Sequence, residues 1–417
     1  MSKHAVVSFN GNKHINTEIT LTGSKSECNR ALIISSLSKG LVDIDNMSNA
    51  ADTVTLNRIL NNISQNDPHQ QTVDVGPAGT AMRFLTAYLS TLPGNFILTG
   101  TERMKQRPIG ILAEALKSIG ASLSYLEQDG YPPIAIIGPL QQQMDSVKIK
   151  GDISSQYISA LLMIAPTLTQ GLTLEIEGEL TSLPYVKMTL DMLEETGIKH
   201  SWNGNSITIK PQQFKASTLA VEPDWSAASY WYSIAALSDK ATIELPYLKD
   251  KSLQGDSRIR KIMEAFGVNT NKTSKGIVLT SAEKSFDDQV LDLKDCPDLA
   301  QTIIVCAAAI GKNLSFTGLE TLKIKETDRV KALQNELSKI GVALKEDNLI
   351  YTLNCDGLHF PEKVTFETYE DHRMAMAFAP LSLMIKEVEL EDMNVVEKSY
   401  PDFWKDLEKA GFTVKEI

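Results

Sequence analysis

Apolar residues gather along this chain in six short runs, each of which follows a polar or glycine-containing turn. Every run is rich in Ala, Leu, Ile and Met and is apolar nearly all round, so the helix that it predicts must be buried. The turns contain Ser, Thr, Asp or Gly, the residue types that cap the start of a helix. Most copies are separated by roughly 70 residues, which is typical of one supersecondary unit used repeatedly. The copies begin at Gly23, Gly76, Gly151, Pro223, Cys296 and Tyr369.

The stretches between the copies have the patterns of strands and of further helices. Strands are predicted at residues 96–98, 172–176, 206–209, 277–279 and 349–353, and helices at residues 109–119, 186–196, 299–310 and 330–340. Six equivalent mixed units divide most simply into two domains of three. If the buried helices of each half begin at the cleft between the halves, their unpaired N–H groups and positive dipole ends converge there. Such a cleft would bind phosphates and carboxylates, whereas a single copy taken alone indicates only a capped helix.

Length and charge narrow the classes of function. A chain of 417 residues exceeds what one compact core usually supports, which favours two domains of roughly 200 residues. Its hydrophobic content of 42% and charged content of 22% are typical of a soluble globular protein. The net charge of −11 argues against a general nucleic-acid-binding protein, because phosphate neutralisation needs a basic surface. An anionic ligand would therefore need a local basic pocket.

Cysteine usage and hydropathy predict a cytoplasmic protein. Cys28, Cys296, Cys306 and Cys355 lie far apart without a C-x-x-C pair, so neither a zinc ribbon nor a disulfide framework is expected. The first 17 residues are polar throughout, and the apolar runs at 160–166 and 303–310 are too short to span a bilayer. We therefore expect neither a signal peptide nor a membrane segment.

The stretch from Lys323 to Arg329 combines cations and carboxylates directly before an amphipathic run. If it opens a helix, Lys325 and Arg329 are spaced i, i+4 and share a face, and Glu326 lies three residues before Arg329. One helical turn would then hold a carboxylate beside two positive groups, forming a pocket for an acidic ligand with a base attached. The alternative is a solvated first turn with ordinary salt bridges.

Three other stretches place polar or cationic groups near predicted helix starts. The turn Gly76 to Thr80 lets backbone approach an anion closely, although it has neither the lysine of a Walker A loop nor a G-x-G-x-x-G spacing. In the stretch Arg103 to Pro108, the proline restricts the backbone conformation of Arg107, and an arginine held rigid suits phosphate recognition. A plain basic loop is an equal alternative. Ser154 to Gln156 supply hydroxyl and amide groups for a phosphate or a polyhydroxylated ring.

Acidic residues before two of the apolar helices allow two interpretations. Asp298 and Asp371 each stand at a predicted helix start, where a carboxylate can cap the helix or act as a base near a substrate hydroxyl. His372 has no partner at metal-ligand spacing, so we expect a packed or hydrogen-bonded histidine. Lys398 carries no motif of its own.

In combination, two of these motifs are highly specific: Lys-x-Lys-Glu-Thr-Asp-Arg at 323–329 and Asp-His-Arg-Met-Ala-Met-Ala at 371–377. On these motifs the chain resembles the EPSP synthase (phosphoshikimate carboxyvinyltransferase) family over nearly its full length. The other stretches that carry the resemblance, in the family's order, are 23–30, 76–83, 103–108, 154–156 and 398–403.

The resemblance implies an α/β fold of two similar domains, each made of three repeats of a βαβαββ-type unit. This is the inside-out α/β barrel of enolpyruvyl transferases, with the active site in the interdomain cleft. The implied domains are residues 1–20 with 224–417, and an inserted domain of residues 21–223 that carries most contacts to shikimate 3-phosphate.

The implied reaction transfers the carboxyvinyl group of phosphoenolpyruvate to the C5 hydroxyl of shikimate 3-phosphate and releases phosphate. It proceeds through a tetrahedral intermediate, without a metal or a cofactor, and serves the shikimate pathway toward chorismate and the aromatic amino acids. The resemblance further implies a cytoplasmic monomer whose partners are these two small molecules, with neither nucleic acid nor membrane involved.

The resemblance also implies roles for single residues. Asp298 resembles the base that takes the C5 hydroxyl proton, Glu326 resembles the acid that protonates the vinyl methylene, and Lys25 is a third catalytic group. The implied contacts of shikimate 3-phosphate are Lys25, Ser26, Arg30, Ser154, Ser155, Gln156, Ser182, Tyr185, Asp298, Thr321 and Lys325. The implied contacts of phosphoenolpyruvate are Lys25, Gly79, Arg107, Gln156, Arg329, Arg373 and Lys398.

Three positions depart from the family pattern. Pro77 replaces the Asn of the usual Gly-Asn-Ala-Gly-Thr turn, which removes a side-chain amide and a backbone N–H. Phe84 stands where many members have Pro, and Thr321 stands where some members have an Asn that contacts the shikimate phosphate. These departures bear on substrate affinity and on sensitivity to the inhibitor glyphosate.

Two other functions compete with this one. The first is the sister enzyme that transfers the same group to UDP-N-acetylglucosamine; Ser154 to Gln156 and the Lys-Glu-Thr-Asp-Arg stretch favour shikimate 3-phosphate instead. The second is an anion-binding protein without turnover. The presence of both Asp298 and Glu326 argues against it, because added negative charge gains nothing for binding anions.

Overall fold

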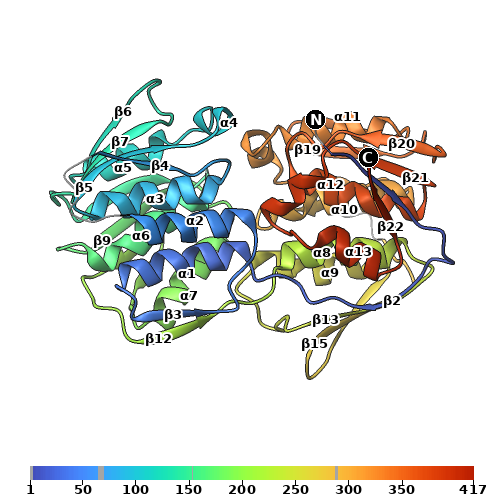
Figure 1. Cartoon of the computed structure of the whole chain (residues 1–417), viewed down its shortest axis with the longest axis horizontal. Helices are drawn as coiled ribbons and strands as arrows, with labels where there is room; N and C mark the ends of the chain where they lie inside the picture. The colour runs from blue at the N-terminus through green and yellow to red at the C-terminus, as the bar shows by residue number, and fades with distance from the viewer. Residues whose placement is uncertain (1–2, 64–69, 153, 287–289) are drawn as a thin grey trace. The chain divides into compact units, whose positions relative to one another are not determined.

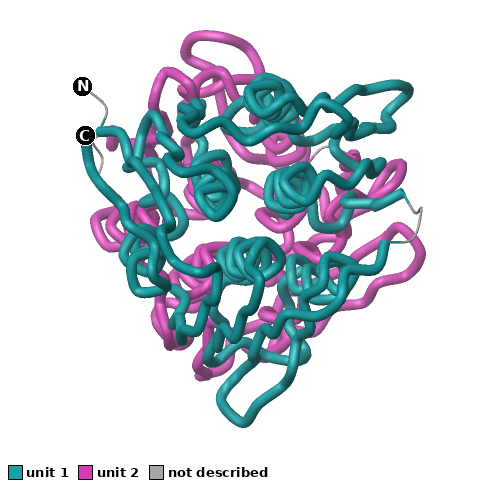
Figure 2. Tube along the Cα trace, turned by 90° about the vertical axis from the view of Figure 1, so that its right-hand side faces the viewer, with its two compact units in different colours: residues 1–22, 222–417 teal, residues 23–221 magenta. Residues whose placement is uncertain are grey.

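The structure of the chain, a computed structural model, describes residues 3–63, 70–152, 154–286 and 290–417. The chain forms two compact units, drawn in two colours in Figure 2. Unit 1 combines residues 1–22 with residues 222–417, whereas unit 2 is the continuous stretch 23–221. The chain therefore begins in unit 1, forms all of unit 2 and then returns to unit 1.

One supersecondary unit, with the order strand–helix–strand–helix–strand–strand, recurs in both units. Its first two strands are parallel and are joined by a buried crossover helix, and its last two strands form an antiparallel hairpin that pairs with the second strand. A copy in unit 2 consists of β4 (Gln70–Asp74), α3 (Gly79–Thr91), β5 (Gly94–Thr99), α5 (Gly110–Ser118), β6 (Ser122–Tyr125) and β7 (Ile134–Gly138), with the short helix α4 (Glu102–Lys105) inserted before α5.

Two further copies have the same order and the same strand pairing. The second copy in unit 2 consists of β8 (Ser146–Lys150), α6 (Ser155–Ile164), β9 (Leu172–Glu177), α7 (Leu183–Glu195), β10 (Ser201–Asn203) and β11 (Ser206–Ile209). A copy in unit 1 consists of β16 (Val290–Asp292), α10 (Ala300–Ile310), β17 (Ser315–Thr317), α11 (Arg329–Ser338), β18 (Ala343–Asp347) and β19 (Ile350–Asn354).

The N-terminal strands complete the two other sheets of unit 1. Strand β2 (His14–Glu18) pairs in parallel with β13 (Lys240–Pro246), and β1 (Ala5–Ser8) lies between β21 (Glu387–Leu390) and β22 (Thr413–Glu416), antiparallel to both. The remaining strands of these sheets are β15 (Gly276–Ser281), β14 (Val268–Lys272) and β20 (Lys363–Phe366). Their helices are α8 (Trp225–Leu237), α9 (Ile259–Glu264), α12 (His372–Phe378) and α13 (Phe403–Lys409).

The third copy in unit 2 is shorter than the others. It consists of α1 (Lys25–Leu37), β3 (Val42–Asp45) and α2 (Ala51–Asn62), and β3 pairs in parallel with β12 (Ser217–Ala220). Because β12 comes from the end of unit 2, this sheet joins the first and last strands of the unit.

The first helix of every copy is buried. Helices α1, α3 and α6 pack against one another in unit 2, and α8, α10 and α12 do so in unit 1 (Figure 1). All residues of α12 are buried, as are all residues of α8 except Ser226. These helices confirm the prediction of six buried helices, and the α/β fold with three repeats in each half is confirmed with them. In the described ranges, no helix has the length and apolar character needed to cross a membrane.

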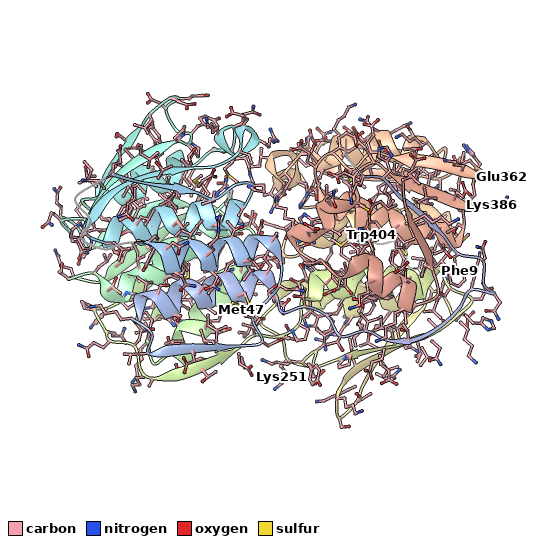
Figure 3. The ribbon with its side chains drawn as sticks, in the orientation of Figure 1. Phe9, Met47, Lys251, Glu362, Lys386 and Trp404 are labelled. Carbon is pink, nitrogen blue, oxygen red and sulfur yellow. The ribbon has the colours of Figure 1, made fainter. Side chains whose placement is uncertain are left out.

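Aromatic side chains in and near α13 pack against one another in the core of unit 1. The ring of Phe403 packs edge-on against Tyr400 and Tyr230, at centroid distances of 5.6 and 5.9 Å. The indole N–H of Trp404, labelled in Figure 3, donates to the carbonyl oxygen of Met393 at 2.8 Å. The buried indole therefore has the hydrogen-bond partner that its N–H requires.

The structure also confirms the other elements predicted from the sequence pattern. The helices expected at 109–119, 186–196, 299–310 and 330–340 are α5, α7, α10 and α11, with ends that differ by at most three residues. The five expected strands are β5, β9, β11, β15 and β19.

Candidate active site

The N-terminal ends of α8, α10 and α12 lie close together in unit 1. Arg373 of α12 contacts residues at the starts of both other helices. Arg373 Nη2 lies 3.0 Å from Asp298 Oδ2, just before α10, and 3.4 Å from Ser226 Oγ, in the first turn of α8. Its Nη1 donates to the carbonyl oxygen of Asp298 at 3.2 Å. Positive helix ends and a guanidinium group therefore gather at one place, which favours the binding of anions.

Arg329, the first residue of α11, binds three carboxylates and is 1% exposed. Its Nε donates to Asp371 Oδ2 at 2.7 Å, its Nη1 to Asp298 Oδ1 at 3.1 Å and its Nη2 to Glu326 Oε2 at 2.9 Å. Burial by itself lowers the pKa of Arg329, but the three carboxylates outweigh burial and raise it. The rigid guanidinium fork thus fixes the positions of Asp298 and Glu326 relative to each other.

Glu326 is held by two cations from different parts of unit 1. Besides Arg329, Lys398 contacts it, with 3.2 Å between Nζ and Glu326 Oε1. Lys398 ends the 3-10 helix η6 (Met393–Lys398), and both side chains are largely buried. The structure therefore brings the predicted acid together with two of the predicted phosphoenolpyruvate ligands.

Asp298 lies among three cations. In addition to Arg329 and Arg373, Lys325 Nζ lies 3.8 Å from its Oδ1. Burial raises the pKa of Asp298, but Arg373, Lys325 and Arg329 together hold it well below its usual range, while burial lowers the pKa of Lys325. Leu299, and not Asp298, stands at the N-cap position of α10. The Asp298 side chain instead pairs with cations.

The expectation that Lys325 and Arg329 share a helix face is wrong. The 3-10 helix η4 (Glu320–Ile324) ends just before Lys325, and α11 begins only at Arg329. Between them, the Asp328 side chain accepts a hydrogen bond from the N–H of Lys331 at 3.0 Å and caps α11. The capping preference of aspartate interrupts the helix where the i, i+4 spacing needed continuity. Lys325 and Arg329 instead meet through Asp298.

Side chains of the expected type cap four of the six buried helices. Ser24, Ser154, Asp224 and Asp371 each accept a hydrogen bond from a backbone N–H in the first turn. The same expectation is wrong for α3 and α10, which have no side-chain cap. For Asp371 the capping interpretation is confirmed, since it caps α12; its carboxylate also binds Arg329. Its neighbour His372 is buried, as expected, with Nδ1 3.7 Å from Asp371 Oδ1.

In unit 2, predicted residues gather at the starts of α3 and α6. A Cβ atom at Gly79 would lie 2.5 Å from Arg107 Nη1, so only glycine lets this guanidinium rest against the start of α3. Gln156 Nε2 donates to Thr80 Oγ1 at 3.2 Å, which joins the starts of the two helices. Arg107 is 8% exposed. The resulting polar group resembles the one in unit 1, with a buried cation beside helix N-termini.

Lys25 is the first residue of α1, and its charge is balanced within unit 2. Its Nζ lies 3.2 Å from Asp52 Oδ2 in α2, and the lysine side chain is 15% exposed against 4% for the aspartate. An anionic substrate would compete with Asp52 for this ammonium group.

Arg30 lies in the interior of unit 2, where its guanidinium meets neutral oxygens. It donates to Thr189 Oγ1 at 2.7 Å, to Ser159 Oγ at 3.0 Å and to the carbonyl oxygens of Ser26 and Tyr185 at 2.9 and 3.3 Å. Burial lowers the pKa of Arg30 to about 10. A buried cation among neutral acceptors would be stabilised by an approaching anion.

Two ring contacts complete the environment of Arg30. The guanidinium lies over Phe84 and over Tyr185, at 5.3 and 5.7 Å from the ring centroids. Phe84, one of the departures from the family pattern, is thus part of the packing that holds this arginine.

The other predicted hydroxyl groups lie at helix starts. Ser154 accepts from the N–H of Gln156 at 3.3 Å, and Ser155 is buried beside it. Ser182 precedes α7 with a left-handed backbone, at φ 55°. Thr321 lies in η4 of unit 1, and its Oγ1 is buried without a hydrogen-bond partner in the described part of the chain.

Three carboxyl or hydroxyl groups of the site were not found by sequence reasoning. Asp52 pairs with Lys25, Ser226 contacts Arg373, and Asp256 binds Ser226. Ser226 stands at a helix start, where a capping role explains it equally well. Asp52 and Asp256 carry no local signal, since their partners are distant in sequence. Among the described residues, no group of three or more His, Cys, Asp or Glu is placed to hold a metal ion.

Comparison with known proteins identifies the family. The sequence model of EPSP synthase (3-phosphoshikimate 1-carboxyvinyltransferase) matches residues 9–407. This chain belongs to the EPSP synthase family. Among relatives, it is 46% identical over 404 residues to a 3-phosphoshikimate 1-carboxyvinyltransferase of Bacteroides fragilis, covering 96% of this chain and 97% of the relative. It is 33% identical to the enzyme of the same name from Aliivibrio fischeri, with 95% and 97% covered.

Solved structures of EPSP synthases and of a related enolpyruvyl transferase share this fold. An EPSP synthase from Acinetobacter baumannii matches with a TM-score of 0.77 at 20% identity, covering 99% of this chain and all of that one. The enolpyruvyl transferase NikO from Streptomyces tendae matches with a TM-score of 0.73 at 13% identity, covering 100% and 99%.

Proposed function

We propose that this chain transfers the carboxyvinyl group of phosphoenolpyruvate to the C5 hydroxyl of shikimate 3-phosphate and releases phosphate. The observation that supports this best, beside membership in the family, is the buried network in which Arg329 holds both Asp298 and Glu326. The reaction needs one acid, one base and several cations for a substrate that carries a carboxylate and a phosphate. Arg373 and Lys398 supply further cations within contact distance of the same two carboxylates.

In this proposal, substrate binding activates the two carboxylates. Without substrate, Arg329, Arg373 and Lys398 neutralise Asp298 and Glu326. Phosphoenolpyruvate bound to these cations competes with both carboxylates, and a carboxylate that is less tightly paired binds a proton more readily. The cations thus serve both to bind the substrate and to control the acid and the base.

The proposed chemistry balances in two steps. Glu326 gives its proton to the vinyl methylene, which becomes a methyl group, while the C5 hydroxyl oxygen bonds to the adjacent carbon and Asp298 takes the hydroxyl proton. In the second step the bond between this carbon and the phosphate oxygen breaks, and Glu326 recovers a proton from the methyl group. The proton that Asp298 took leaves with the released phosphate, so both carboxyl groups return to their starting states. Charge that develops on the phosphate is stabilised by the cations around it.

We assign shikimate 3-phosphate to the residues named for it from the resemblance. The chemistry of Arg30, Lys25 and the Ser154–Gln156 turn supports this assignment, because a buried guanidinium, an ammonium and several hydroxyl groups suit a phosphorylated polyhydroxy ring. Lys325 and Thr321 are proposed contacts from unit 1. Phosphoenolpyruvate is assigned to Lys25, Gly79, Arg107, Gln156, Arg329, Arg373 and Lys398.

We also infer that the protein works as a monomer in a reducing compartment. All four cysteines are buried and none is in a disulfide, as expected where thiols stay reduced. Sedimentation at micromolar concentration tests the first point, because a mass near twice 45.9 kDa would contradict it.

An acceptor assay tests the proposed function. Phosphate release from phosphoenolpyruvate is measured with shikimate 3-phosphate, with UDP-N-acetylglucosamine and without an acceptor. Release with shikimate 3-phosphate alone is the expected result. Release only with the nucleotide sugar would assign the chain to the sister reaction, and no release with either acceptor would show an anion-binding protein.

Two variants test the assigned roles in the same assay. Glu326→Gln and Lys25→Met are expected to stay folded and to lose turnover by a factor of at least about 10². Glu346→Gln is the matched control, because Glu346 pairs with Lys323 on the surface at 2.7 Å. Full activity of Glu326→Gln would remove its proton-transfer role.

A further inference from the structure

Asp256 is a buried carboxylate that adjoins the cluster in unit 1 and has no part in the mechanism above. It lies in the 3-10 helix η2 (Gly255–Arg258) and is 2% exposed. Its Oδ2 accepts a short hydrogen bond from the hydroxyl of Ser226, at the start of α8. Its Oδ1 is buried without a hydrogen-bond partner in the described ranges. Burying a carboxylate with one unsatisfied oxygen costs free energy of folding, so the position of Asp256 beside the site requires an explanation.

Ser226 connects Asp256 to the candidate base. The Ser226 hydroxyl has one proton, which it donates to Asp256, and its oxygen accepts from Arg373 Nη2 at 3.4 Å. The same Nη2 lies 3.0 Å from Asp298 Oδ2. The order Asp256–Ser226–Arg373–Asp298 is therefore a continuous chain of polar contacts from η2 to the start of α10.

The titratable and charged groups near Asp256 come from the starts of three buried helices. Asp224 precedes α8, Cys296 and Asp298 flank the turn before α10, and Arg373 lies in α12. Burial raises the pKa of Asp256 to about 7; Asp298 and Asp224 add to the increase, whereas Arg373 and the Ser226 hydroxyl oppose it. The carboxyl group of Asp256 therefore changes charge near neutral pH. Only the Ser226 hydroxyl lies between it and Arg373.

We propose that Asp256 is a positioning residue for the reaction: through Ser226 it orients Arg373, and its charge controls how strongly Asp298 attracts a proton. This inference rests on the proposed function. When Asp256 is ionised, a second negative charge near Asp298 partly offsets the three cations around that residue, so Asp298 becomes a better acceptor of the C5 hydroxyl proton. When Asp256 is protonated, the cations hold Asp298 as a weak base.

The first experiment measures kcat and KM from pH 5.5 to 9. We expect kcat of the native enzyme to rise about three- to tenfold through pH 7, and this rise to be absent in Asp256→Asn, which keeps the shape but cannot ionise. Ser226→Ala is expected to raise the KM for phosphoenolpyruvate more than that for shikimate 3-phosphate, because Arg373 loses a partner. A profile of Asp256→Asn that superimposes on that of the native enzyme overturns the inference.

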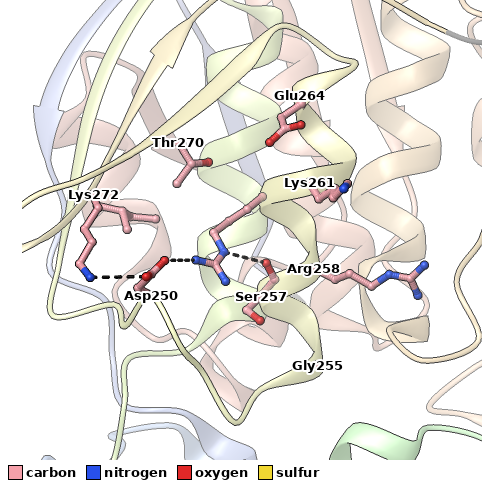
Figure 4. A pocket seen from close by; sticks show the side chains of 10 residues that line it. Asp250, Gly255, Ser257, Arg258, Lys261, Glu264, Thr270 and Lys272 are labelled. Atoms are coloured by element: carbon pink, nitrogen blue, oxygen red, sulfur yellow. Dashed lines mark hydrogen bonds and ion pairs between the residues drawn. The ribbon is translucent and has the colours of Figure 1, made fainter.

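Asp250→Asn is the matched control. Asp250 lies six residues earlier, and its carboxylate pairs with Arg260 at 3.2 Å and with Lys272 at 3.4 Å (Figure 4). These residues line a surface pocket of about 500 Å³ beside η2. We expect this variant to keep the pH profile of the native enzyme. Loss of the rise in both variants would show a general effect of charge removal and would contradict the specific role of Asp256.

A second experiment needs no turnover. With aspartate labelled by ¹³C at the carboxyl carbon, NMR should show one buried group that titrates near pH 7 and whose signal disappears in Asp256→Asn. A second aspartate signal should shift with the same midpoint in the native protein and disappear in Asp298→Asn. If neither acceptor supports turnover, the proposed function fails, while the absence of this coupled titration overturns the inference about Asp256 independently.

Discussion

Single side chains in the candidate site are positioned mainly by opposite charges in a buried setting. Arg329 binds three carboxylates, and Asp298 contacts three cations. Each of these charges is tolerated inside the protein only because its partners are present, so removal of one member leaves the others uncompensated. The same dependence makes the network responsive to an anionic substrate, which adds new partners for the cations.

Gly79 is the position where side-chain size should matter most. In Gly79→Ala, the new Cβ would lie 2.5 Å from Arg107 Nη1, so the guanidinium must move. Because the obstacle is the end of a flexible side chain, we expect a stability loss below about 1 kcal/mol but an increase of the KM for phosphoenolpyruvate by about tenfold or more. Steady-state kinetics with each substrate varied in turn give the measurement.

Arg107→Ala provides the control for Gly79. If the glycine matters only because it makes room for the guanidinium, Gly79→Ala should add little once Arg107 is removed. Additive effects of the two substitutions would contradict this explanation.

Asp256 should also make stability depend on pH. Its folded-state pKa of about 7 lies above the usual value for an unfolded aspartate, so its favourable contribution is complete at low pH and is lost as pH rises through about 7. Relative to the native protein, Asp256→Asn should therefore gain stability between pH 5 and pH 8, on the order of a few kcal/mol at most. Thermal unfolding at these pH values gives the measurement, and a constant difference between the two proteins would contradict it.

Among the elements, the apolar helices were predictable and the segment before α11 was not. Helices such as α8 and α12 consist mainly of apolar residues and are buried on every side, and this composition can be recognised from local sequence without knowledge of partners. The segment from Lys325 to Asp328 instead depends on competition between helix continuation and capping. The charge partners of Lys25 and Asp298 could not be predicted from the sequence either, because only packing between helices brings Asp52 and Arg373 near them.

The cap of α11 gives a prediction at this scale. Asp328→Ala removes the side chain that accepts from the N–H of Lys331, and should cost about 1 kcal/mol of stability in denaturant unfolding. Asp328→Asn keeps an acceptor and is the control, with an expected loss of only a few tenths of a kcal/mol. Because Arg329 follows the cap directly, the alanine variant should also lower kcat. Equal stability of the alanine and asparagine variants would contradict the capping role.

Across the whole molecule, the two units differ in how they are assembled from the chain. Unit 2 is continuous, whereas unit 1 needs β1 and β2 from the N-terminus to complete two of its sheets. Strand β1 is internal, between β21 and β22, so without it β22 has no neighbour in its sheet. Such strand pairing between distant segments cannot be deduced from a local pattern of residues.

Fragments of the chain test this difference. Residues 23–221 expressed alone should fold cooperatively, because the sheets of unit 2 draw their strands from this stretch alone. Residues 222–417 alone should not fold, and a peptide of residues 1–22 added in trans should restore structure. Circular dichroism and hydrogen exchange provide the measurement. Cooperative unfolding of 222–417 without the peptide would contradict the expectation.

The internal place of β1 also bears on synthesis in the cell. Val7 is synthesised well before its partners Val388 and Val414, which lie roughly 400 residues later in the chain. At about 5 to 20 residues per second, the strand waits on the order of 20 to 80 seconds for a sheet to join. During this interval unit 2 is completed while β1, which is unpaired and partly apolar, remains attached to it. Chaperones that bind the nascent residues around β1 should therefore affect the yield of native protein more than chaperones that bind any later segment.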